Sequence, residues 1–245
     1  MTVVETHKPA RTMMQRLKHH LYSHFYIKMT VVMLVSILIF PAIHKIHAGV
    51  AAIVMVDVVM MMMTMQMVTF ASRQRQLRRL MLIFCGVGAI IFDIYTALQP
   101  NEFSIILSSA FFCVFYAYAI YSMLRYVLLP GRITLDRLFA SLTAYMTMAL
   151  FWALIYRILF VFDPTSFRFD SSIQRSEVPF FDFIYFSYAT ITTTGYGDIV
   201  PNTHQVQSFA IVEQMVGVLY VAILVARLTN LYTTANEGPL DETRA

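Results

Sequence analysis

Seven consecutive residues near the C-terminal end of the chain combine hydroxyl groups, two glycines and a carboxylate. They are Thr192, Thr193, Thr194, Gly195, Tyr196, Gly197 and Asp198. The glycines on both sides of the tyrosine allow backbone conformations that other residues resist, so this run is not expected to be helical. The polar groups that it offers for chemistry are its hydroxyls, its carboxylate and its own backbone.

The composition indicates the surroundings of this run. Hydrophobic residues make up 58% of the 245 residues and charged residues only 13%, against about 45–50% and about 25% in soluble proteins. The chain is therefore expected to be a membrane protein without a large soluble domain. The formal net charge of +4 is too small to suggest nucleic acid. Cys85 and Cys113 both lie in apolar runs, which predicts neither a disulfide framework nor a zinc site.

Apolar runs long enough to span a bilayer, which takes about 20 residues, predict an all-α transmembrane fold with about six spans. The predicted spans are 27–46, 50–70, 80–98, 103–129, 138–160 and 205–228. They divide the chain into an N-terminal tail (1–26), a four-helix domain (27–129), a linker (130–137), a domain formed by the last two spans (138–228) and a C-terminal tail (229–245). The first 26 residues are basic and lack the apolar region of a signal peptide.

The distribution of basic residues predicts the orientation. Six spans place both termini on one side of the membrane. Fourteen of the 18 Lys and Arg residues fall in the tails and loops on that side, and four fall on the opposite side. The positive-inside rule then places both termini in the cytoplasm. We expect a multi-pass protein of the plasma membrane, or inner membrane of the cell, in contact with lipid.

The segment between the last two spans must be re-entrant. Residues 179–192 are too few to cross the bilayer, and the Gly-rich run follows them directly. Non-helical backbone at membrane depth survives only where it is buried in protein or lines a water-filled path. The sequence therefore predicts a short helix beginning at Pro179, followed by a loop that borders such a path.

The run resembles the selectivity filter of the potassium channel superfamily, Thr-x-Gly-Tyr-Gly-Asp after a Thr-rich pore helix. Thr193 to Asp198 match it, Thr192 occupies the usual preceding place, and Pro201 comes before the inner helix. The layout also resembles six-span bacterial-type channel subunits. The resemblance covers about 138–228; over the first 137 residues it rests on helix count and topology alone.

This resemblance implies a passive potassium channel, with K⁺ as permeant ion and no other cofactor. Rings of backbone carbonyls from four chains would replace the ion's water, so it also implies a homotetramer. The implied ion-binding residues are Thr193, Thr194, Gly195, Tyr196 and Gly197, with the Thr193 hydroxyl included. Val is the most frequent family residue at the place of Thr194. Tyr196 stands where non-selective relatives carry Asp, which favours potassium selectivity.

Further residues are candidates to support this filter. Tyr185 lies thirteen residues before Asp198, where many relatives have a Trp that hydrogen-bonds the Asp, so we expect a contact between Tyr185 and Asp198. Thr192, directly before the filter, is a further candidate to support it. Glu213 is an ionisable residue inside a predicted span and hence a functional candidate; a neutral or hydrogen-bonded Glu that braces the pore helix is the favoured interpretation.

Gly217 follows Gly197 by twenty residues, the spacing of the inner-helix hinge in the family. A glycine inside a helix costs about 1 kcal/mol relative to Ala. It either lets the helix bend at a gate or allows close packing on the pore helix. By the same alignment Val218, Val221 and Val225 would line the cavity and the inner constriction.

The fourth span lacks the ladder of arginines that a voltage sensor needs, since Arg125 is the only arginine between residues 103 and 129. Weak or absent intrinsic voltage dependence is expected.

The first three predicted spans contain other candidate residues. Asp57 and Asp93 could share a proton or a cation, or they could be residues of a water-filled crevice. A Met cluster in the second span has a spacing found in copper sites but is more typical of packing. His44 and His47 could titrate near neutral pH.

Two other functions are compatible with the sequence. A voltage-gated potassium channel with a reduced sensor is disfavoured by the missing ladder. A transporter or accessory membrane subunit is disfavoured because the chain shows no repeated halves. An enzyme is not expected, because no catalytic constellation is present outside the predicted pore. The sequence does not indicate what opens and closes the pore.

Overall fold

The structure is a computed structural model that describes residues 25–43, 76–99, 101–129, 134–170 and 178–236. Its long helices are α2 (Phe25–Ile43), α4 (Gln76–Leu98), α5 (Glu102–Leu128), α6 (Leu135–Phe162) and α8 (His204–Asn236). Between α6 and α8 lie the short elements η1 (Pro164–Ser166), β1 (Phe167–Phe169), α7 (Phe180–Ile191) and β2 (Ile199–Pro201). The described part of the chain is therefore mostly helical.

Polar residues at the helix starts explain several of these boundaries. The Asn101 side chain accepts a hydrogen bond from the backbone N–H of Phe103 at the start of α5, and Thr134 caps α6 in the same way through Arg137. Such caps satisfy N–H groups that have no partner within the helix. Pro179 is the residue immediately before α7, where its missing N–H costs nothing.

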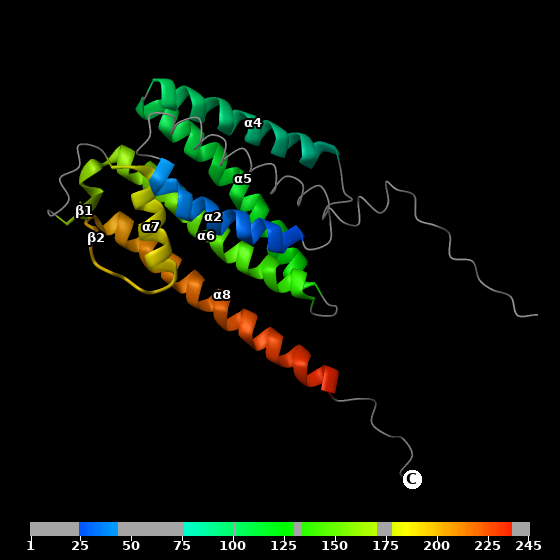
Figure 1. Cartoon of the computed structure of the whole chain (residues 1–245). Helices are drawn as coiled ribbons and strands as arrows, with labels where there is room; N and C mark the ends of the chain where they lie inside the picture. The colour runs from blue at the N-terminus through cyan, green and yellow to red at the C-terminus, as the bar shows by residue number, and fades with distance from the viewer. Residues whose placement is uncertain (1–24, 44–75, 100, 130–133, 171–177, 237–245) are drawn as a thin grey trace, which may run out of the picture.

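Helix α6 is the centre of the arrangement. It contacts α2, α5, α7 and α8, while α4 packs on α5 (Figure 1). The hydroxyls of Thr30 and Thr143 lie 2.8 Å apart between α2 and α6, and Asp136 accepts a hydrogen bond from the backbone N–H of Tyr26 at 3.2 Å. Helix α8 runs along one side of the bundle, and its C-terminal end projects past the other helices (Figure 1).

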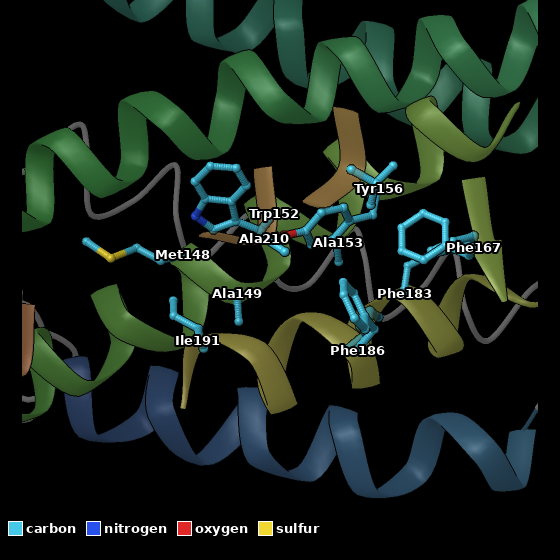
Figure 2. Close-up of a cluster of buried hydrophobic side chains, with 12 residues drawn as sticks. Met148, Ala149, Trp152, Ala153, Tyr156, Phe167, Phe183, Phe186, Ile191 and Ala210 are labelled. Carbon is cyan, nitrogen blue, oxygen red and sulfur yellow. The ribbon is translucent and has the colours of Figure 1, made fainter. Parts of the chain in front are cut away.

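An aromatic core joins α6, β1 and α7. Tyr156, Phe167, Phe183 and Phe186 gather at one end of this core and Trp152 lies toward the other (Figure 2). The rings of Tyr156 and Phe186 meet edge to face with centroids 5.0 Å apart, an arrangement that aromatic pairs favour. Phe167 belongs to the polar stretch between the last two predicted spans, yet only 5% of its surface is exposed. The core therefore fixes α7 and the segment before it onto α6.

Two short strands tie the segment before α7 to the segment after the Gly-rich run. β1 and β2 pair antiparallel, with Phe167 opposite Pro201. Beyond the pair, the backbone and side-chain N–H groups of Asn202 donate to the carbonyls of Ser166 and Thr165 at 2.8 and 2.9 Å. No sequence pattern predicts these strands. The pair holds the segment after the Gly-rich run against the segment between α6 and α7.

The helices can be compared with the predicted spans. Three described helices are long and apolar enough to cross a membrane, namely α5, α6 and the part of α8 from His204 to Arg227. Helices α2 and α4 lie at the first and third predicted spans but have shorter apolar parts among the described side chains. The second predicted span, 50–70, lies outside the described residues. Helix α8 continues eight residues past the predicted end at 228.

Candidate functional site: the loop after helix α7

The Gly-rich run begins where α7 ends, and its N–H groups turn back onto that helix. An α-helix leaves its last four carbonyls without partners inside the helix. Here the run supplies donors to them. The bonds are Thr192 N–H to Tyr188 O (3.2 Å), Thr193 N–H to Thr190 O (2.9 Å), and both Thr194 N–H (2.8 Å) and Gly195 N–H (3.1 Å) to Ala189 O. The first half of the run is thereby fixed to the C-terminus of α7 by its own backbone.

The backbone angle φ alternates in sign along the run. It is +58° at Thr193, +58° at Gly195 and +81° at Gly197, and it is not positive at Thr194 or Tyr196. Alternation between left- and right-handed conformations turns successive N–H groups toward one side of the chain. In a trans peptide unit the carbonyl points opposite to the N–H group. Because the N–H groups of Thr194 and Gly195 bond to α7, the carbonyls of Thr193 and Thr194 point away from that helix.

The positive φ values explain the two glycines. A Cβ placed on Gly195 or Gly197 meets no atom within 4 Å, so the requirement comes from the backbone angle alone. Thr193 adopts the same left-handed region although it is β-branched, which costs about 1–2 kcal/mol. Strained backbone of this kind persists where the surrounding structure holds it, and it concentrates at functional sites.

The three threonine hydroxyls have different partners. Thr192 donates to the carbonyl of Tyr188 at 2.6 Å, and its oxygen lies 2.9 Å from the hydroxyl of Thr194. The Thr193 hydroxyl donates to the carbonyl of Thr192 at 2.7 Å. A hydroxyl that donates its proton keeps its lone pairs for other contacts, so the Thr193 oxygen is still able to accept a cation.

Tyr185 on α7 contacts two parts of the run. Its ring stacks on that of Tyr196, with centroids 5.8 Å apart and an angle of 10° between the planes. Its phenol also forms a hydrogen bond with Asp198. A phenol can donate to a carboxylate, so Tyr185 links α7 to the end of the run. The stacking on Tyr196 was not foreseen from the sequence.

Glu213 lies behind α7 and is completely buried. Tyr156 of α6 donates to its Oε2 atom at 2.5 Å, and Ser187 of α7 lies 2.5 Å from its Oε1 atom. One carboxyl group therefore joins α6, α7 and α8.

Gly217 packs directly on the end of α7. A Cβ at this position would lie 2.3 Å from the carbonyl oxygen of Ile191 and 2.8 Å from its Cγ1 atom. The same carbonyl accepts a hydrogen bond from the hydroxyl of Tyr145 at 2.9 Å. Of the two roles considered for Gly217, close packing has a direct contact in the structure.

The run and part of α8 are open in the single chain. Residues 192–197 are exposed, and Tyr196 exposes 69% of its surface. Val218, Val221 and Val225 are each about half exposed. They repeat at intervals of three and four residues, so they form one stripe on α8. An apolar stripe on α8 thus remains uncovered by the described part of the chain.

The other candidates named from the sequence lie in the first 100 residues. Asp57, His44, His47 and the Met cluster lie outside the described residues. Asp93 is on α4, which packs mainly on α5. In the described ranges no group of three His, Cys, Asp or Glu side chains could hold a metal ion.

Several residues at the site were missed by the sequence analysis. Ser187, Tyr156 and Tyr145 bond to Glu213 or to the end of α7, and the Tyr188 hydroxyl donates to the Met146 carbonyl on α6 at 3.0 Å. All are hydroxyl residues inside apolar helices. A hydroxyl in such a helix needs a hydrogen-bond partner, and this was the available signal.

Comparison with known proteins places this site in an ion-channel domain. Residues 144–234, from within α6 into the last part of α8, match the model of a protein family described as "Ion channel". No curated protein and no solved structure matches the chain. The matched residues include α7, the Gly-rich run and nearly all of α8. The matched residues are therefore similar to an ion-channel domain, and α5, α6 and the first part of α8 are long and apolar enough to cross a membrane.

The packing at Gly217 generates a first prediction, for Gly217→Ala. If the glycine served only to let α8 bend, alanine would strengthen the helix by about 1 kcal/mol. Because its Cβ would instead collide with the Ile191 carbonyl, we expect a loss of about 1–3 kcal/mol, typical of overpacking. Thermal unfolding in detergent measures this. Gly88→Ala is the control, since its Cβ would meet only the Phe111 ring, at 3.4 Å. A Gly217→Ala protein more stable than the wild type contradicts the packing role.

The second prediction concerns Tyr185→Phe. The substitution keeps the ring against Tyr196 and removes the phenol that bonds to Asp198. Hydrogen bonds to charged groups contribute about 1.5–3 kcal/mol where they are buried and less where water reaches them, so we expect a lower free energy of unfolding. Thermal unfolding in detergent measures it. Tyr121→Phe, at an exposed position on α5, is the control. Unchanged stability in the Tyr185 variant would contradict the predicted brace.

Proposed function

We propose that the protein is the subunit of a potassium-selective channel, in which residues 193–197 form the selectivity filter. The observation that carries the proposal is the alternation of φ over Thr193, Gly195 and Gly197, with the N–H groups of residues 194 and 195 bonded to α7. The peptide units of these bonded N–H groups point the carbonyls of Thr193 and Thr194 away from α7, into space that the single chain leaves open. In the proposed filter, Gly195 and Tyr196 continue this row of carbonyls.

A row of carbonyls suits a dehydrated cation. K⁺ gives up its hydration water only where oxygens replace it, and rings of backbone carbonyls from several chains supply them. The implied ligands are the carbonyls of Thr193, Thr194, Gly195 and Tyr196, with the Thr193 hydroxyl as an additional oxygen. The oxygens are backbone atoms, so the fixed loop sets their positions. The stacking of Tyr185 on Tyr196 and the hydrogen bonds to the Ala189 carbonyl would keep those positions constant as ions pass.

The filter needs four chains, so the channel is proposed to be a homotetramer. One chain supplies one side of each ring of oxygens. The exposed apolar side chains of α8 support this assembly, because they need lipid or protein to cover them. These residues are Ile211, Val212, Met215, Val218, Leu219, Val221, Ile223 and Val225. Val218, Val221 and Val225 would line the cavity below the filter.

Weak intrinsic voltage dependence is part of the proposal. α5 carries one basic residue, Arg125, in its last turn. Moving one charge through the membrane field contributes about 2.3 kcal/mol per 100 mV, and steep gating needs several such charges. A steep dependence of open probability on voltage in the purified channel would contradict this part.

Ion flux through vesicles tests the proposed function. Lipid vesicles that contain the purified protein are expected to release K⁺ much faster than empty vesicles. Gly195→Ala should lower this release about five- to thirtyfold, because φ of +58° strains any residue with a Cβ by about 1–2 kcal/mol. Gly88→Ala should release K⁺ like the wild type. Two results would contradict the proposed filter. One is a rate of K⁺ release from wild-type vesicles no higher than from empty vesicles, and the other is release by Gly195→Ala at the wild-type rate.

The subunit count can be measured separately. Native mass spectrometry of the detergent-solubilised protein is expected to show four copies of the 28.2 kDa chain. Val221→Glu would place a charge on the proposed cavity stripe of α8, whereas Phe103→Glu changes an exposed position at the start of α5. The first variant should lose the tetramer or its flux and the second should retain both. A monomeric wild-type protein that still conducts would contradict the assembly.

A further inference from the structure

The buried hydroxyls around Glu213 form a continuous chain of contacts. Tyr156 lies 2.5 Å from Oε2 of Glu213, and Ser187 lies 2.5 Å from Oε1. The Ser187 oxygen also lies 2.7 Å from the carbonyl oxygen of Ala149 on α6. Tyr156, Ser187 and Glu213 are each 0% exposed. The chain therefore runs from α6 through α8 and α7 and back to α6.

Counting protons along this chain fixes their positions. Ser187 has one hydroxyl proton and two oxygen neighbours at hydrogen-bond distance, Ala149 O and Glu213 Oε1. A carbonyl can only accept, so the Ser187 proton must lie on the contact to Ala149. The contact between Ser187 and Glu213 then needs a proton from the carboxyl group. Tyr156 supplies the proton on the other side, toward Oε2.

We propose that Glu213 is a neutral carboxylic acid in the folded protein, and that its proton clamps α7 to α6 and α8. The protonated Oε1 donates to Ser187, Ser187 donates to Ala149 O, and Oε2 accepts from Tyr156. Each polar atom in the chain then has a partner and each O···O contact has one proton. If Glu213 were ionised, the contact between Ser187 and either Ala149 or Glu213 would contain no proton.

The surroundings of Glu213 favour the neutral form. An ionised carboxylate away from water is costly unless a cation pairs with it. The titratable groups of the described chain that act on Glu213 or are acted on by it are Tyr156 and Tyr145, both on α6, and α7 contributes the Ser187 hydroxyl. These groups are neutral phenols and an alcohol. None supplies a positive charge to stabilise the ionised carboxylate.

The clamp lies beside the proposed filter. Ser187 is two residues before Ala189, whose carbonyl holds the N–H groups of Thr194 and Gly195. Gly217, one turn after Glu213 on α8, packs on Ile191 at the end of the same helix. Loss of the Glu213 proton would place a buried negative charge here and break one contact, so alkaline pH is expected to loosen α7. The protonation state stands without the proposed function, whereas an effect on ion flux rests on it.

Infrared spectroscopy of the full-length protein in lipid tests the proton directly. At neutral pH the wild type is expected to show the carbonyl band of a protonated carboxylic acid, and Glu213→Gln should lose that band. In Ser187→Ala the band should remain and shift to higher frequency, because the acid has lost its acceptor. A wild-type spectrum without the band at neutral pH, or a band unaffected by both substitutions, overturns the proposal.

The pH profile provides a second measurement on the wild type itself and does not require any variant to fold. As the pH is raised above about 4.3, where a Glu carboxyl group of the unfolded chain loses its proton, the thermal stability should fall. This fall should level off once the acid band has disappeared. The ratio of K⁺ flux at alkaline pH to flux at neutral pH should be low in the wild type and close to one in Glu213→Gln, since glutamine accepts from Tyr156 and donates to Ser187 without titrating. A thermal stability that does not fall over this pH range, or that falls equally in Glu213→Gln, overturns the clamp. If the acid band is present but the protein shows no K⁺ flux, the proposed channel function is wrong, whereas the assignment of a proton to Glu213 is unaffected.

Discussion

The structure around the site depends on one constraint: the N–H groups at the start of the Gly-rich run satisfy the free carbonyls at the end of α7. These bonds let the backbone leave the helix without an unpaired buried group. They also orient the start of the run, because the carbonyls of Thr193 and Thr194 point opposite to the bonded N–H groups of Thr194 and Gly195. The position of α7 therefore determines where these two carbonyls lie.

Four separate sets of contacts hold α7 in place. The aromatic core fixes its first half to α6 and β1. The pairing of β1 with β2 connects the segments before and after the loop. Glu213 joins α7 to α6 and α8 through hydroxyls, and Gly217 lets α8 approach the Ile191 carbonyl. Polar contacts inside apolar surroundings are geometrically specific, whereas apolar packing alone tolerates rearrangement.

The sequence predicted what depends on local pattern and missed what depends on tertiary contact. Hydropathy located α5 and α6 to within three residues at each end, and Pro179 marked the start of α7. The β1–β2 pair was missed because a three-residue strand inside a polar stretch has no periodic signal, and its partner lies more than thirty residues away. The stacking of Tyr185 on Tyr196 and the contacts of Ser187 likewise arise only when α7 packs. The sequence left two roles open for Gly217, and a contact with Ile191 favours packing.

The central claim is that the carbonyls of residues 193–196 select potassium. The most direct measurement is the reversal potential of purified wild-type protein in a planar bilayer, with potassium on one side and sodium at equal concentration on the other. The account predicts a current that reverses far from zero, at the potential expected when potassium alone carries charge. A reversal potential near zero, with currents present, would contradict it.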